Sequence, residues 1–223
     1  SADVVIYQQG DIRFIVNTVK GSMASNFANT HGASVSAMGF KVKDAAYAYQ
    51  HVVNQGAKPY LPQNEKILYD MPAIYGVGKS LIYFVDYKNG KSNYAHHFTA
   101  FPDAPLTHVG NGLTYIDHVT HNLYRGNMDE WADFYTRLFN FREVRYFDIE
   151  GRMTGLKSRA MTSPCNKLRI PLNESSDDKS QIEEFLKDFN GEGIQHIALG
   201  TNDIYSSVEQ LKHQGLVFLD TPD

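Results

Sequence analysis

The sequence predicts a mixed α+β fold in which one kind of strand–helix–strand unit occurs in both halves of the chain. Short apolar runs with strand-like alternation are interspersed with segments of helical spacing across the 223 residues. Residues 35–44 also align with residues 194–203 at an offset of 159 (194 − 35), which superimposes two candidate helix caps, Asp44 and Asp203. Repetition at this offset indicates two related modules.

The first half is predicted to begin with a hairpin, because the turn residues Gln9, Gly10 and Asp11 separate two apolar runs. Asp44 is expected to cap a helix that ends at Gly56. The expected strands span residues 4–7, 12–17, 34–42, 67–71 and 81–86, and a further short helix is expected over residues 22–30.

A domain boundary is expected at residues 101–105, where two prolines in five residues interrupt regular structure. The predicted domains are therefore residues 1–105 and 106–223. In the second domain, Ser180 and Glu183 form a capping box for a helix. The expected strands span residues 115–120, 145–149, 154–160, 167–171 and 194–199, with a last strand after Gly215, and further helices span residues 128–139 and 203–213.

Composition excludes several classes of protein. A net charge of −4 argues against a general nucleic-acid binder, which needs a basic surface. The one cysteine, Cys165, excludes an internal disulfide framework and a cysteine zinc site, and it agrees with a reducing, cytoplasmic setting. No apolar run approaches the roughly 18 residues of a membrane span. Both ends interrupt strand-like runs, so we expect the sequence to be a fragment.

Two histidines occur in matching strand contexts. His118 and His196 both follow the pattern Ile-x-His-(Val/Ile), and they lie 78 residues apart (196 − 118). A single histidine within an apolar strand is usually a core residue. In the repeat, however, the position of His196 is taken by Ala37, so the fold itself does not require a histidine there. Two strands that each present one imidazole at the same depth can meet at a metal ion.

Strand alternation assigns these side chains to faces of the sheet. His118 is expected to share its face with Thr120, while Asp117 points to the opposite side. Two imidazoles without thiolates suit Fe(II), Zn, Mn or Ni, and a site of this type needs one carboxylate as well. The acidic residues Glu143, Asp148 and Glu174 lack the apolar strand setting of the histidines. The weaker histidine candidates are His31, His51, His96, His97, His108, His121 and His213.

Several motifs together resemble the 4-hydroxyphenylpyruvate dioxygenase family of the vicinal-oxygen-chelate superfamily. The motifs occupy residues 116–118, 139–141, 169–174, 180–184 and 190–198. The resemblance implies repeated βαβββ modules that form two open barrels, as in glyoxalase and bleomycin-resistance proteins. It makes residues 1–105 a non-metal barrel truncated at its start, and residues 106–223 a catalytic barrel truncated at its end.

The resemblance also implies roles for individual residues. His118 and His196 would bind Fe(II), with a glutamate beyond Asp223 as the third ligand. Neutral polar residues would line the pocket near the ring end of the substrate: Ser158, Asn173 and Gln181. Gln195 also matches a residue on the substrate side of the family's site. Alternation directs it away from the metal, so we interpret it as a residue that fixes a neighbouring group.

The implied reaction converts 4-hydroxyphenylpyruvate and O2 to homogentisate and CO2 in tyrosine catabolism. The fragment itself is expected to be inactive, and the family implies a homo-oligomer, a dimer or a tetramer. One alternative is hydroxymandelate synthase, which oxidises the benzylic carbon of the same substrate; Pro171 and Asn173 favour the dioxygenase. A second alternative is a non-catalytic small-molecule-binding protein of the same fold. A glutamate within a strand beyond Asp223 would distinguish enzyme from binding protein.

Overall fold

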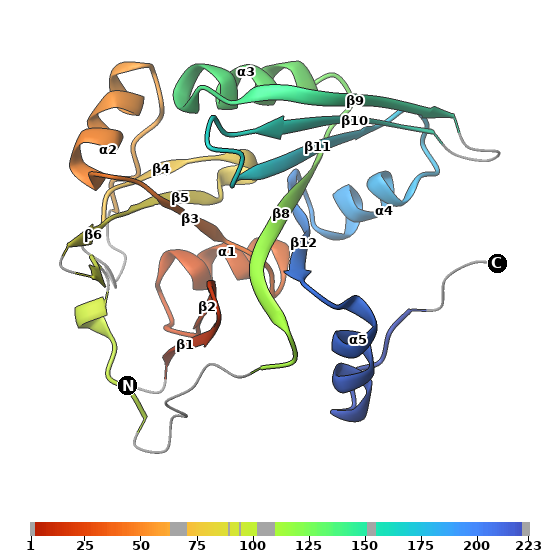
Figure 1. The fold of residues 1–223 in the computed structure, drawn as a ribbon. Coiled ribbons are helices and arrows are strands. Elements are labelled where there is room, and N and C mark those ends of the chain that lie inside the picture. Colours follow the sequence, from red (N-terminus) through yellow and green to blue (C-terminus); the bar gives the residue numbers. More distant parts are fainter. Residues whose placement is uncertain are drawn as a thin grey trace.

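The computed structural model describes residues 3–62, 71–88, 90–93, 95–101, 110–150 and 155–219 (Figure 1). The first half contains β1 (Val4–Gln9), β2 (Ile12–Asn17), α1 (Met23–His31), β3 (Ala37–Lys41), α2 (Ala45–Asn54), β4 (Ala73–Tyr75), η1 (Val77–Lys79), β5 (Leu81–Val85), β6 (Tyr87–Lys88), β7 (Lys91–Ser92) and η2 (Ala95–His97). The second half contains β8 (Leu113–Leu123), α3 (Met128–Phe139), β9 (Arg142–Glu150), β10 (Gly155–Thr162), β11 (Arg169–Ser175), α4 (Gln181–Asp188), β12 (Gly193–Thr201) and α5 (Ile204–His213).

The largest sheet has five strands in the order β12-β8-β11-β10-β9. Its chain order β8, α3, β9, β10, β11 is one βαβββ module, in which β11 returns parallel to β8 and β12 adds antiparallel to the other edge of β8. The first half contributes a three-stranded sheet, β3-β5-β4. The predicted α+β class is therefore confirmed, and within the described residues the sheets stay open and form no closed barrel.

The predicted repeat is visible as two strand–helix units, β3–α2 and β12–α5. Asp44 accepts a hydrogen bond of 2.8 Å from the backbone amide three residues later, and Asp203 accepts the equivalent bond of 3.1 Å. Both helices are followed by a glycine, Gly56 and Gly215, each with φ of +90°. This left-handed conformation favours glycine and ends the helix. The same local signals thus begin and end both helices.

Two strand predictions differ from the structure. The last strand, expected after Gly215, does not form over residues 216–219; a strand needs a hydrogen-bonded neighbour, and no described segment pairs with these residues. Most of the strand expected at 67–71 lies outside the described residues, and β4 forms just after it, at Ala73–Tyr75. The proposed boundary at 101–105 also falls largely outside the described residues.

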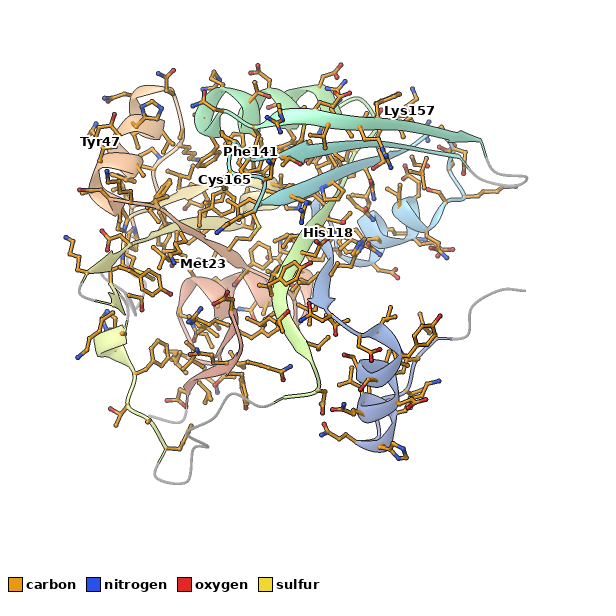
Figure 2. The ribbon with its side chains drawn as sticks, viewed as in Figure 1. Met23, Tyr47, His118, Phe141, Lys157 and Cys165 are labelled. Atoms are coloured by element: carbon orange, nitrogen blue, oxygen red, sulfur yellow. The ribbon has the colours of Figure 1, made fainter. Side chains whose placement is uncertain are left out.

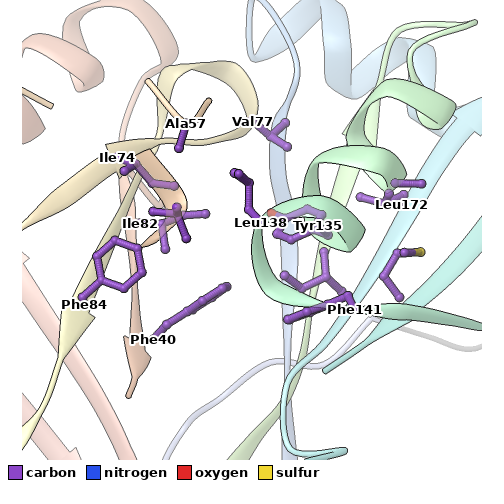
Figure 3. Close-up of a cluster of buried hydrophobic side chains, with 14 of the residues drawn as sticks. Phe40, Ala57, Ile74, Val77, Ile82, Phe84, Tyr135, Leu138, Phe141 and Leu172 are labelled. Carbon is purple, nitrogen blue, oxygen red and sulfur yellow. The ribbon is translucent and has the colours of Figure 1, made fainter. Parts of the chain in front are cut away.

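One hydrophobic cluster joins the two halves (Figure 3). Phe40 on β3 packs edge-on against Phe139 at the end of α3, with ring centroids 5.2 Å apart, and it stacks on Phe141 at 6.3 Å. Tyr135 and Leu138 of α3 are buried in the same cluster. Side chains of α3 therefore connect the two halves, and Figure 3 shows Tyr135 and Leu138 between Ile82 and Leu172. No helix of the described chain combines the length and apolar character needed to cross a bilayer.

The cap at Asp44 provides a first test of this fold. Asp44→Ala is expected to lower the free energy of unfolding by about 1 kcal/mol, because the amide of Tyr47 loses its acceptor. Asp44→Ser should stay within a few tenths of a kcal/mol, roughly, because serine caps as well as aspartate. Urea denaturation measures both values. Equal stability of the alanine and serine variants would contradict the assigned cap.

Candidate metal centre and substrate cavity

The structure brings His118 and His196 together on neighbouring antiparallel strands. In the register of β12 with β8, Ala198 pairs with His118 and His196 pairs with Thr120, so the two histidines are diagonal neighbours. Their ring centroids lie 5.4 Å apart, and the rings are inclined at 78°. Figure 2 shows His118 where β8 runs beside β12. The sheet therefore provides two converging imidazoles from segments far apart in the sequence.

Hydrogen bonds set the tautomer of both rings in the same way. His118 Nδ1 donates to Asp117 Oδ2 over 2.8 Å, and His196 Nδ1 donates to Gln195 Oε1. Both of these oxygens only accept, so each Nδ1 carries a proton, and Nε2 is the nitrogen that a neutral ring leaves free for a metal ion. Thr120 Oγ1 lies 2.9 Å from His196 Nε2 and donates to it. A metal ion at His196 Nε2 would therefore replace this hydrogen bond from Thr120.

Electrostatics favour the neutral form of His196. Burial lowers the pKa of His196, and the nearby His118 ring lowers it further. A metal ion binds only the unprotonated nitrogen of an imidazole. The setting of His196 therefore keeps it ready for a ligand role near neutral pH.

Two β-bulges correct the expected directions of the residues before the histidines. Alternation predicted that Asp117 points away from His118, and this is wrong; Gln195, expected to point away from the metal and to fix a neighbouring group, bonds to the ring of His196. The register of β12 with β8 shifts between Ala198 and Leu199, which leaves Asp117 without a partner, and it shifts again at Gln195. An extra residue in one strand redirects its side chain. Each bulged residue therefore reaches the Nδ1 of the histidine that follows it.

A cavity of about 390 Å³ is lined in part by Gln195, the residue that accepts the hydrogen bond from His196. Three residues predicted to contact substrate, Asn173, Gln181 and Gln195, line it together. The fourth, Ser158, pairs with Asn173 across β10 and β11 but is not among the described lining residues. Gln195 both lines the cavity and bonds to His196, so it connects the cavity wall to the histidine pair, although neither histidine is among the described lining residues.

Asn122 also lines the cavity and was missed in the sequence. It lies two residues after Thr120 and pairs with Asn173, so alternation along β8 places it on the histidine face. The Oδ1 atoms of Asn122 and Asn173 are buried and have no hydrogen-bond partner among the described residues. A buried acceptor without a donor costs about 1–3 kcal/mol. A bound molecule with a hydroxyl group would supply the missing donor.

The acidic residues considered as a third ligand have other partners. Glu174 Oε2 accepts from the amides of Gly126 and Met128, 3.0 and 3.3 Å away, where α3 begins. Glu143 pairs with Arg159 at 2.9 Å. The side chain of Asp148 lies outside the described part of the structure. Among the described residues, no group of three or more His, Cys, Asp or Glu residues could hold a metal.

His121 lies on the opposite face of β8, as alternation predicts. Its Nε2 is 2.8 Å from the hydroxyl of Tyr135 on α3, and its side chain is fully buried. Burial lowers the pKa of His121 to about 4, and a hydrogen bond with the Thr120 backbone opposes this only in part. His121 therefore belongs to the packing between the sheet and α3, not to the candidate metal centre.

Two family models match the chain. The model described as hydroxyphenylpyruvate dioxygenase, HPPD, N-terminal matches residues 1–99. The model described as the glyoxalase/bleomycin resistance protein/dioxygenase superfamily matches residues 115–223. Both histidines and the described cavity residues lie within the second match.

Two relatives match this chain over 99–100% of its length. The chain is 54% identical over 225 residues to hemolysin VllY of Vibrio vulnificus, covering 100% of this chain and 63% of that protein. It is 53% identical over 221 residues to a 4-hydroxyphenylpyruvate dioxygenase of Legionella pneumophila, covering 99% of this chain and 62% of that protein. The chain thus spans 62–63% of the length of these relatives.

The fold matches a solved mutant of 4-hydroxymandelate synthase from Streptomyces coelicolor. The TM-score is 0.80 and the identity 22%, and the match covers 98% of this chain and 65% of that one. Because the identity is low, this likeness shows the fold alone. Together with the sequence relatives, it confirms the expected vicinal-oxygen-chelate architecture. Over its whole length the chain is therefore similar to 4-hydroxyphenylpyruvate dioxygenases, and its second half matches the model of the glyoxalase/bleomycin resistance protein/dioxygenase superfamily.

Proposed function

We propose that the protein containing this chain is an Fe(II)-dependent dioxygenase that converts 4-hydroxyphenylpyruvate and O2 to homogentisate and CO2 in tyrosine catabolism. The observation that carries the proposal is a pair of converging imidazoles that Gln195 connects to a cavity, in which two amide acceptors lack donors among the described residues. Similarity to this family implies a metal cofactor. The 53% identity to a relative with this name supports the reaction.

The residues present fit Fe(II). His118 and His196 would hold the metal, and a glutamate beyond Asp223 would complete a set of two histidines and one carboxylate, which suits non-haem Fe(II) and leaves positions open. When bound, Fe(II) supplies redox chemistry and sites for O2 and for the 2-oxo acid. Asp117 and Gln195 would hold both neutral imidazoles in the Nδ1–H tautomer, which leaves Nε2 for the metal.

The cavity fits the phenol end of the substrate. Asn122 and Asn173 offer buried oxygens that can accept a hydrogen bond from the phenol hydroxyl. We assign Gln181 and Ser158 to the same end of the substrate. Asn122 lies two residues along β8 from Thr120, about 7 Å, and Thr120 pairs with His196. The substrate would therefore lie along β8, with its 2-oxo acid group at the histidines. Neutral amides hold a phenol without titrating, so binding should not depend on their protonation.

The two halves of the chain would have different roles in this protein. Residues 1–105 would form the domain without metal, and residues 106–223 the domain that holds it; the matched ranges 1–99 and 115–223 support this division. We also propose a cytoplasmic homo-oligomer, a dimer or a tetramer. Residues 1–223 by themselves, without the third ligand, would be inactive.

Product analysis tests the reaction. Full-length protein with Fe(II), O2 and 4-hydroxyphenylpyruvate is expected to release homogentisate and CO2. Chromatography against authentic standards separates this product from 4-hydroxymandelate, which would identify the alternative synthase. Asn173→Leu removes one amide acceptor at similar volume and should raise KM more than it lowers kcat, because the phenolic donor loses its partner. Tight substrate binding without O2 consumption would instead identify a non-catalytic binding protein.

A further inference from the structure

We infer that Asp117, itself held by Arg169, is the positioning residue that orients His118 toward the metal. The inference rests on the proposed function in that His118 is taken as a ligand. Asp117 Oδ2 accepts from His118 Nδ1 at 2.8 Å, and Asp117 Oδ1 accepts from Arg169 Nη1 at 2.8 Å. One carboxylate thus uses its two oxygens for two different partners.

The strand pairing explains why these three side chains meet. Arg169 opens β11, and three residues later Leu172 pairs with His121, which is three residues after His118. The parallel register therefore brings the start of β11 beside the His118 segment of β8. The bulge at Asp117 turns its carboxylate to the same place. Without the bulge, Asp117 would follow the alternation and face away from His118.

Arg169 limits the freedom of the carboxylate. The side chain of Asp117 is one-third exposed, at 33%, so water would compete for an unanchored carboxylate. The guanidinium of Arg169 is a fixed donor, and it occupies the oxygen that His118 does not use. The remaining oxygen is thereby directed at Nδ1. A carboxylate that accepts from the second nitrogen of a metal-binding imidazole fixes its tautomer and makes it a stronger ligand.

The two histidines differ in this support. His196 Nδ1 donates to the neutral amide oxygen of Gln195, whereas His118 Nδ1 donates to the charged carboxylate of Asp117. Both supporting residues lie at bulges directly before their histidine. The same backbone device thus positions both rings, but only His118 gains the electrostatic contribution of an anion. The metal affinity of His118 should therefore fall further on loss of Asp117 than it would if Asp117 only packed against the ring.

The test uses the full-length protein and two measurements that do not require turnover. Asp117→Ala is expected to weaken Co(II) binding, measured by anaerobic titration of the metal alone, about 10–100-fold. In the metal-free protein, ¹⁵N NMR of the imidazoles should show that the Nδ1–H tautomer of His118 is lost. Asp117→Asn retains an oxygen that can accept from Nδ1, so it should keep the tautomer and bind Co(II) more tightly than the alanine variant. Arg169→Gln should give a smaller loss than Asp117→Ala.

Asp129→Ala is the matched control. It removes another aspartate that pairs with an arginine at 2.8 Å, Arg159, but it touches neither histidine. It should leave the Co(II) affinity and the tautomer unchanged. The inference is overturned if Asp117→Ala binds Co(II) as the wild type does, if His118 keeps its Nδ1–H tautomer, or if the wild type binds no Co(II).

The failure of this inference can be told from failure of the proposed reaction. If the wild type forms 4-hydroxymandelate while Asp117→Ala loses the tautomer and the Co(II) affinity, the reaction is wrong and the role of Asp117 stands. If the wild type forms homogentisate and Asp117→Ala retains both properties, the reaction stands and the role of Asp117 is wrong.

Discussion

In the full-length protein, His196→Ala is expected to abolish Fe(II)-dependent O2 consumption with 4-hydroxyphenylpyruvate. The substitution removes one of the two imidazoles that converge across β8 and β12. A single histidine and one distant carboxylate cannot hold Fe(II) in a defined geometry. The rate should therefore fall by more than the roughly 10–100-fold expected when a residue that hydrogen-bonds to a metal ligand is removed. An oxygen electrode measures the rate directly.

His51→Ala is a suitable control for this variant. His51 lies on α2, where its side chain is exposed and its ring stacks against Tyr47 at 6.3 Å. The substitution also removes an imidazole, and it should leave O2 consumption unchanged. O2 consumption retained by His196→Ala at the wild-type rate would contradict the ligand assignment. Anaerobic Fe(II) titration of both variants separates lost metal binding from lost catalysis.

Local signals made much of the fold predictable. The predicted helix caps at Asp44, Ser180 and Asp203 all accept the expected backbone bond, because a cap depends only on residues three positions apart. The repeat was equally visible, since both copies carry the same start and end signals. The strand expected after Gly215 was wrong because pairing depends on a neighbour that local residues do not specify.

The candidate site was predictable only to the level of strand faces. His118 and His196 stood out because their contexts match, and Asn122 could have been found by continuing the alternation along β8. Asp117 could not have been found in this way. Its direction depends on a register shift between two strands 78 residues apart in sequence (196 − 118), and its anchor Arg169 comes from a third strand. Bulges are a property of the pair of strands, so a single strand pattern does not reveal them.

The buried His121 predicts a large dependence of stability on pH. Its pKa falls from 6.5 to about 4 on folding, because burial disfavours the charged ring. Between pH 6.5 and about 4, His121 binds a proton in the unfolded chain and stays neutral in the folded protein. The free energy of unfolding should therefore fall as pH drops from about 6.5 to 4, by roughly 3 kcal/mol from this group. Above pH 6.5 His121 is neutral in both states and contributes no slope.

The double variant His121→Leu/Tyr135→Phe isolates this contribution. It removes the imidazole together with its hydroxyl partner, 2.8 Å away, so neither polar atom is left buried alone. The carboxylates and the histidines of the candidate site titrate in both proteins and cancel in the comparison. Urea denaturation at pH 7 and pH 4 should show that the wild type loses roughly 3 kcal/mol more stability than the double variant. Equal losses would mean that His121 accepts a proton in the folded state, and that the sheet and α3 separate enough to admit water at acid pH.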